Sequence, residues 1–137
     1  MEMRPFDEIE HTADRAFCAR GRNLRELFEH AAQAMFALEA CGEGQPVVGP
    51  VRDLTVAGFD RETLLINWLN ELLYLHEVHK ENYVDFEVLE ISDVRLRARM
   101  RVCGRGEVRR LIKAVTFHNL KLQQAEKGWE ATIVVDV

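Results

Sequence analysis

The chain has 137 residues, enough for one average domain but not two, and 47% of them are hydrophobic, so a core can form without disulfide or metal staples. The formal net charge of −5 argues against a protein whose main task is to hold nucleic-acid phosphates, because such binding depends on lysine and arginine. No apolar run reaches the roughly 18 residues of a membrane helix, and the first residues lack the apolar stretch of a signal peptide, so we expect one cytoplasmic domain over residues 1–137 that does not enter a membrane.

The first third of the chain predicts two short strands and a helix. The strands span 6–10 and 14–20, and the helix spans 23–38, where apolar residues recur at helical spacing. Asn23 is a good N-cap, and Glu26 stands where a reciprocal capping carboxylate is found. The apolar face of this helix consists of Leu24, Leu27, Phe28, Ala31, Met35 and Leu38.

A second helix is predicted over 60–79, after a short strand at 51–58. Its apolar stripe is wide, which indicates packing against a sheet. His76 and His79 are three residues apart rather than the four of a zinc-protease helix, so we favour a structural role at the helix end. The stripe consists of Leu64, Leu65, Trp68, Leu69, Leu72, Leu73 and His76.

The remainder alternates apolar and polar residues, which is typical of strands. We expect strands at 84–88, 94–102, 111–118, 120–123 and 129–137, joined by short turns. Strands that follow one another through tight turns pair antiparallel. The sequence therefore predicts an α+β fold with an antiparallel or mixed sheet and two main helices.

Four arginines on one face of the 94–102 strand are the most visible charge feature: Arg95, Arg97, Arg99 and Arg101. They could contact RNA phosphates or an acidic patch on a protein partner. They could also form cross-strand ion pairs with Asp85 and Glu87. We favour the ion pairs, because these acidic residues lie on the neighbouring arm of the predicted hairpin.

Cysteines 18, 41 and 103 are odd in number and form no CxxC motif, so buried thiols are expected. No catalytic triad is suggested by local spacing, which argues against an enzyme. Two aspartates are of more interest. Asp14 follows a polar segment between strands. Asp136 is the penultimate residue, on the opposite face of the last strand from its apolar side chains, and a chain-terminal carboxylate at Val137 would stand beside it. Such oxygens suit a hard divalent cation, although an aspartate before a strand is more often a turn residue.

Five blocks in order resemble the archease family. Together they span nearly the whole chain, which makes the resemblance specific although each block alone is weak. They are Glu10-His11-Thr12-Ala13-Asp14, NLRELFEHAA at 23–32, LLINWLNELLY at 64–74, KAVTFH at 113–118, and GWEA at 128–131 with the closing Asp136-Val137. The resemblance implies a strand-helix-strand-strand module that carries a second such module as an insertion.

The resemblance also implies a function. Archeases are accessory proteins, not enzymes, that activate RtcB-type RNA ligases. These ligases join RNA ends bearing a 3′-phosphate or 2′,3′-cyclic phosphate to a 5′-hydroxyl in tRNA splicing and RNA repair, using GTP and manganese. Archease-like proteins promote guanylylation of the ligase and multiple turnover. A chaperone-like role toward RNA-modifying enzymes is the alternative, and a stand-alone metal-dependent hydrolase is a weaker one.

The family's metal site carries over onto Asp14, Asp136 and the Val137 carboxylate, with calcium, manganese or magnesium as the expected ion. Lys113 falls in a motif block and is expected to be functional, with His118 as a companion. Glu10 and His11 would orient Asp14. Departures from the family pattern are Arg15 and Ala16, where an aliphatic residue and glycine are usual, and Phe117 in place of a tyrosine.

Overall fold

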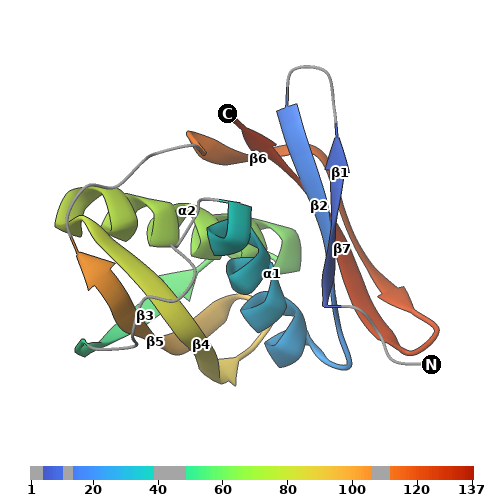
Figure 1. The fold of residues 1–137 in the computed structure, drawn as a ribbon. Helices are drawn as coiled ribbons and strands as arrows, with labels where there is room; N and C mark the ends of the chain where they lie inside the picture. The colour runs from blue at the N-terminus through green and yellow to red at the C-terminus, as the bar shows by residue number, and fades with distance from the viewer. Residues whose placement is uncertain (1–4, 11–13, 39–48, 106–111) are drawn as a thin grey trace.

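The computed structural model describes residues 5–10, 14–38, 49–105 and 112–137. These residues form helices and strands in the order predicted, except that the two strands expected at 111–118 and 120–123 are one continuous strand. Figure 1 shows their arrangement. The elements are β1 (Phe6–Glu10), β2 (Asp14–Gly21), α1 (Leu24–Leu38), β3 (Val51–Ala57), α2 (Arg61–His79), β4 (Glu81–Ile91), β5 (Arg95–Arg105), β6 (Ala114–Ala125) and β7 (Gly128–Asp136).

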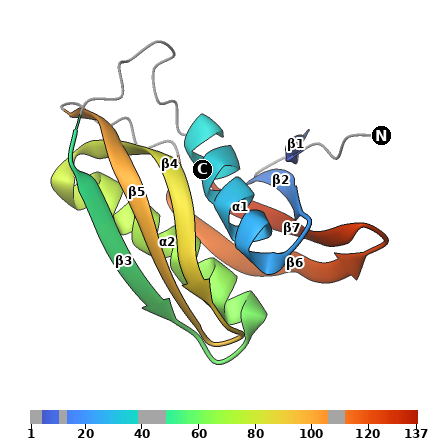
Figure 2. The same cartoon turned by 90° about the horizontal axis from the view of Figure 1, so that it is seen from below.

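The strands form two separate antiparallel sheets. One has the order β1-β2-β7-β6 and the other β3-β5-β4, and Figure 2 shows β5 between its two neighbours. In chain order, β2-α1-β6-β7 make one strand-helix-strand-strand unit, the outer module. The elements β3-α2-β4-β5 make a second unit, the inserted module, between α1 and β6. This confirms the predicted α+β fold and its insertion, and it divides the expected sheet in two.

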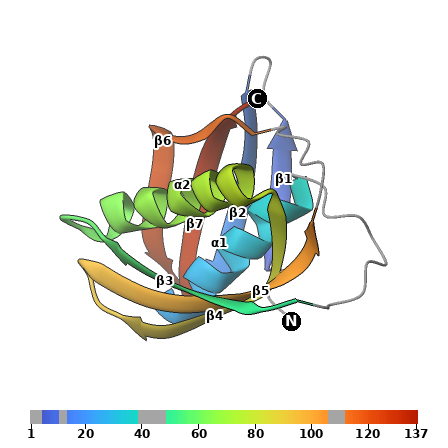
Figure 3. The same cartoon turned by 90° about the vertical axis from the view of Figure 1, so that its left-hand side faces the viewer.

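Both helices lie between the two sheets. Helix α1 contacts β2 of the outer sheet and β4 of the inserted sheet, and α2 contacts β6 on one side and β3 and β4 on the other. Figure 3 shows α2 running across the gap between the sheets. This position explains the wide apolar stripe of α2, because the helix buries side chains toward both layers. No helix in the described ranges is long and apolar enough to cross a membrane.

Capping residues set the start of each helix within one residue of the prediction. In α1 the Glu26 N–H donates to Asn23 Oδ1 at 2.9 Å. The Glu26 carboxylate accepts from the Arg22 N–H at 3.3 Å, one residue before the expected partner. In α2 the Thr63 N–H donates to Asp60 Oδ1 at 2.8 Å. Polar residues that satisfy exposed helix N–H groups thus mark both starts.

The Glu26 cap predicts a pH dependence. The Arg22 guanidinium donates to Glu26 Oε2 at 3.0 Å, and this hydrogen bond is the largest cause of a lowered pKa for Glu26. A lowered pKa adds stability above the unfolded pKa of 4.5, and this stability is lost as the pH falls through the folded pKa. Glu26→Gln is therefore expected to lower the melting temperature by about 2 °C at pH 7. Calorimetry should show the difference shrinking below pH 4.5; a difference that grows on acidification would contradict the assignment.

Strand β5 confirms the predicted alternation at most positions. Leu96, Ala98, Met100 and Val102 are buried. Val94 was expected with them, but this prediction was wrong: Val94 is 49% exposed because it precedes the strand, in the turn after β4.

Two of the four arginines of the β5 face lie in ion pairs, but not with the predicted partners. Arg97 contacts Glu90 of β4 at 3.1 Å, and Arg99 contacts Asp53 of β3 at 3.0 Å. Arg99 lies opposite both Asp53 of β3 and Glu87 of β4 in the two ladders, and its side chain pairs with Asp53. Asp85 falls in the irregular stretch of β4 between Val84 and Glu87 and has no ladder partner there. Cross-strand neutralisation therefore accounts for part of this basic face. Two of the cysteines, Cys18 and Cys103, are buried thiols as predicted, and Cys41 lies outside the described residues.

Candidate functional site

The sheet register brings together three of the predicted site residues. Asp14 begins β2, Asp136 ends β7, and the two are direct Cα partners in the antiparallel ladder. On the other side of β7, Asp136 lies opposite Ala114, and the Lys113 N–H donates to the Asp136 carbonyl at 2.8 Å. The start of β2, the end of β7 and the start of β6 therefore meet at one end of the outer sheet, near the C label in Figure 1.

This end of the sheet is open to solvent and rich in charge. The side chains of Lys113, Asp136 and Val137 are exposed. Asp14 is described by its backbone alone. Partners in an antiparallel ladder share one face of the sheet, and like charges placed opposite each other repel unless a counterion lies between them. A pair of aspartates in this register fits the oxygen donor set of a hard divalent cation.

Among the side chains that the structure describes, no group of three histidines, cysteines or carboxylates gathers as a metal cluster. The Asp14 side chain is not among the described side chains. The support for this site is therefore the backbone pairing of Asp14 with Asp136 between β2 and β7. Val137 directly follows β7 and is 46% exposed. A carboxylate at Val137 would therefore be next in the chain to Asp136.

The remaining predicted residues are placed differently. Glu10 ends β1 and lies opposite Arg15, and His11 falls outside the described residues. His118 is exposed, and its N–H donates to Thr116 Oγ1 at 2.8 Å. It belongs to the irregular stretch of β6 before Lys121, where the register with β7 shifts. The ladder thus does not place His118 beside Asp136.

Sequence reasoning missed a residue that supports the site from the inserted module. Asn70 of α2 donates through Nδ2 to the Val115 carbonyl at 3.0 Å, and the Val115 N–H donates back to Asn70 Oδ1 at 2.8 Å. Strand β6 is at the edge of its sheet, so this amide takes the place of a neighbouring strand. The feature of the sequence that could have indicated this role is the position of Asn70 on the side of the predicted helix away from its leucine stripe. Asn70 fixes β6 two residues after Lys113.

A second polar cluster, around Glu81, is buried elsewhere. The Glu81 carboxylate is paired with Arg52 at 2.6 Å and accepts from the Tyr83 hydroxyl at 3.2 Å. Burial is the main cause of a raised pKa for Tyr83, followed by the negative charge of Glu81. His76 is 1% exposed and its Nδ1 lies 2.8 Å from the Glu81 carbonyl, which agrees with the structural role expected for it. This cluster ties β3 and α2 to the start of β4.

Comparisons with known proteins identify the family of this chain. The Archease protein family (MTH1598/TM1083) matches residues 6–137. Protein archease of Archaeoglobus fulgidus is 39% identical over 136 residues, which cover 94% of this chain and 96% of that protein. Protein archease of Methanosarcina acetivorans is 36% identical over 140 residues, with 96% and 95% covered.

Solved structures share the fold. The solution structure of protein 1598 from Methanobacterium thermoautotrophicum superposes with a TM-score of 0.80 at 29% identity, covering 98% of this chain and 100% of that one. A crystal structure from Thermotoga maritima, described as an archease and possible chaperone, has a TM-score of 0.66 at 24% identity over 100% and 99% of the chains, and it supports the fold alone. With a family match over residues 6–137 and relatives above 30% identity over nearly its whole length, the chain belongs to the archease family.

Proposed function

We propose that this protein is a cytoplasmic accessory protein that activates an RtcB-type RNA ligase and is not itself an enzyme. In this role it promotes the GTP-dependent guanylylation of the ligase and its multiple turnover on ends bearing a 3′-phosphate and a 5′-hydroxyl, in tRNA splicing and RNA repair. Membership of the archease family supports the proposal. The observation that links the proposal to particular residues is the direct pairing of Asp14 with Asp136 in the β2–β7 ladder.

In this proposal Asp14, Asp136 and a carboxylate at Val137 hold a divalent cation, which is calcium, manganese or magnesium. A bound cation would neutralise phosphate oxygens of GTP at the ligase active site. The backbone N–H of Lys113 is bonded to the Asp136 carbonyl, and in this proposal the Lys113 ammonium group adds a second positive charge at this end of the sheet. Glu10 and His11 are proposed to support Asp14 from the segment that precedes it.

The charge distribution favours the ligase, rather than this protein, as the main holder of RNA. The net charge is −5, and two arginines of the β5 face are already paired with carboxylates. RNA contact by this chain is then local and follows from docking on the ligase. A steep salt dependence of RNA binding by the isolated chain would contradict this division of roles.

The test is RNA joining by the ligase of the same organism, with RNA in excess and this protein substoichiometric. The wild type is expected to carry the reaction beyond one turnover per ligase. Asp14→Asn and Asp136→Asn are expected to lower the multiple-turnover rate at least about tenfold, since they remove the anionic donors without changing side-chain size. The control is Asp85→Asn, an exposed aspartate of β4 whose positive φ of 54° suits asparagine.

The outcomes separate the alternatives. Equal loss in all three variants would point to charge in general rather than to the paired aspartates. Full activity of Asp14→Asn and Asp136→Asn would overturn the metal site while leaving ligase activation standing. A wild type that leaves ligase turnover unchanged would favour the chaperone-like role, whose test is suppression of client aggregation without dependence on either aspartate. Phosphate-ester turnover by the protein alone would favour the hydrolase.

A further inference from the structure

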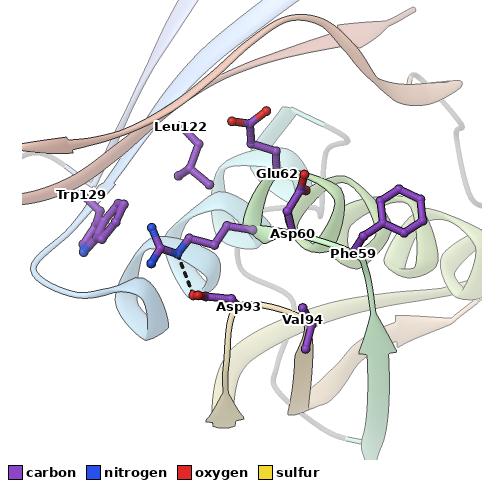
Figure 4. Close-up of a pocket in the computed structure, with 8 residues that line it drawn as sticks. Phe59, Asp60, Glu62, Asp93, Val94, Leu122 and Trp129 are labelled. Atoms are coloured by element: carbon purple, nitrogen blue, oxygen red, sulfur yellow. Dashed lines mark hydrogen bonds and ion pairs between the residues drawn. The ribbon is translucent and has the colours of Figure 1, made fainter.

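A pocket lies where the two modules meet, at the opposite end of β7 from Asp136. It has a volume of about 460 Å³ and is bordered by the start of α2, the turn between β4 and β5, and strands β6 and β7. Figure 4 shows its lining residues. Trp129 lies opposite Gly21 at the start of the β7 ladder, whereas Asp136 lies at its end. At about 3.3 Å per residue, the pocket is roughly 20 Å from the paired aspartates.

The guanidinium of Arg61 contacts residues of both modules in the pocket wall. Arg61 Nε donates to Asp93 Oδ1 at 2.7 Å, and the Arg61 guanidinium carbon lies 4.9 Å from the centre of the Trp129 ring. Arg61 and Asp93 belong to the inserted module and Trp129 to the outer one. The positive charge of Arg61 is thus already engaged in the pocket wall, by the ion pair with Asp93 and the cation–π contact with Trp129.

Two further carboxylates lie at the rim of the pocket. The exposed side chains of Asp60 and Glu62 line the pocket beside Asp93. Asp60 accepts the Thr63 N–H, and that hydrogen bond is the main cause of a lowered pKa for Asp60, so it is ionised at neutral pH. With three carboxylates against one guanidinium, the lining carries a net negative charge. Such a surface attracts cations and repels phosphate groups.

Apolar side chains accompany these carboxylates. Phe59 is 86% exposed and Val94 is 49% exposed, and Leu122 and Trp129 line the opposite side (Figure 4). A phenylalanine that is almost fully in water contributes nothing to the core. Exposed aromatic side chains beside a concave surface are typical of protein interaction sites, in which aromatic residues are enriched.

We propose that this pocket, the acidic pocket, binds a basic segment of a partner protein. An arginine or lysine of that segment meets Asp60 and Glu62, and an adjacent apolar side chain packs on Phe59 and Val94. The combination of anionic rim and apolar wall selects a protein segment over RNA, whose phosphates the carboxylates would repel. The assignment does not depend on the paired aspartates or on a bound cation, and it leaves the carboxylate end of β7 uncovered.

The test uses the full chain labelled with ¹⁵N and a capped synthetic peptide in which two arginines flank a leucine-phenylalanine pair. NMR shifts are expected at Phe59 to Glu62, at Val94 and at the Trp129 indole N–H. Phe59→Ala and Glu62→Lys are each expected to raise the dissociation constant at least about fivefold. The matched controls are Tyr74→Ala, an aromatic that is 54% exposed near the other end of α2, and Glu87→Lys, an exposed glutamate of β4; both should stay within about twofold.

Four results would overturn the proposal. The first is the absence of shifts that saturate and map to the acidic pocket. The second is equal binding of a peptide with glutamate in place of arginine. The third is the same pattern of shifts with single-stranded RNA. The fourth is concentration-dependent broadening without peptide that Phe59→Ala removes, since this would assign the pocket to a second copy of the chain.

Discussion

Trp68→Ala is expected to lower the free energy of unfolding by about 4 kcal/mol. The Trp68 side chain is fully buried on α2, and its indole N–H donates to the Phe28 carbonyl of α1 at 3.0 Å. Its ring also meets Phe86 of β4 edge to face, with 6.3 Å between ring centres. The substitution therefore leaves a cavity where both helices meet the inserted sheet, and it removes a buried hydrogen bond. Urea denaturation followed by circular dichroism measures the loss.

Two further variants keep this prediction testable if Trp68→Ala does not fold. Trp68→Phe retains an aromatic ring but loses the indole N–H, and a loss of about 2 kcal/mol is expected. Phe59→Ala removes a whole ring from a position that is 86% exposed, so its effect should stay within about 0.5 kcal/mol. Comparable losses for Phe59→Ala and Trp68→Ala would show that burial is not the source of the effect.

Asn70→Leu is expected to cost about 3 kcal/mol of stability and to loosen the start of β6. Leucine has the same branched side-chain shape as asparagine but cannot form hydrogen bonds to Val115, which is 4% exposed. The Val115 N–H and carbonyl would both lose their partner in a buried setting, where an unsatisfied polar group costs about 1–3 kcal/mol. Urea denaturation measures the total, and hydrogen exchange at the Val115 amide reports the local change.

Asn67→Leu provides the matched control on the same helix. Within the described residues the Asn67 side chain makes one hydrogen bond, from Nδ2 to the Ala57 carbonyl at 2.8 Å. A loss of about 1 kcal/mol is expected, with no faster exchange at Val115. If both variants lost the same stability, or if the Val115 amide stayed protected in Asn70→Leu, the paired hydrogen bonds would not be what holds β6 in place.

The helices could be predicted closely because their signals are local. The cap residues Asn23 and Asp60 each bond an N–H three residues further on, so start and register are set within one turn. The alternation of β5 is equally local, and four of its five predicted apolar positions are buried. The prediction that Val94 is buried was wrong because the apolar–polar alternation of the sequence continues past the start of β5. The end of the strand is visible only in the backbone pairing with its neighbours.

The candidate site could not be derived from spacing, because its residues come from opposite ends of the chain. Nothing within a few residues of Asp14 indicates that β2 pairs with β7, and the family resemblance alone joined Asp14 to Asp136 before the register placed them opposite each other. The ion pair of Arg99 with Asp53 was missed for the same reason, since helix α2 and strand β4 separate β3 from β5 in the chain. Strand β6 was expected as two pieces, and it continues through Asn119 at a positive φ of 58°.

The insertion of one module into the other predicts an order in which the strands pair during folding. Strands β4 and β5 follow each other directly and can pair early, whereas β2 must find β7 across the entire inserted module. Pairing between distant segments carries a larger loop-closure cost and is slow. We therefore expect the pairing of β2 with β7 to form last, and a chain that had folded only its inserted module would have no pair of opposed aspartates to present. Trp68 and Trp129 stand in different modules, so their fluorescence gives the two stages separate reporters.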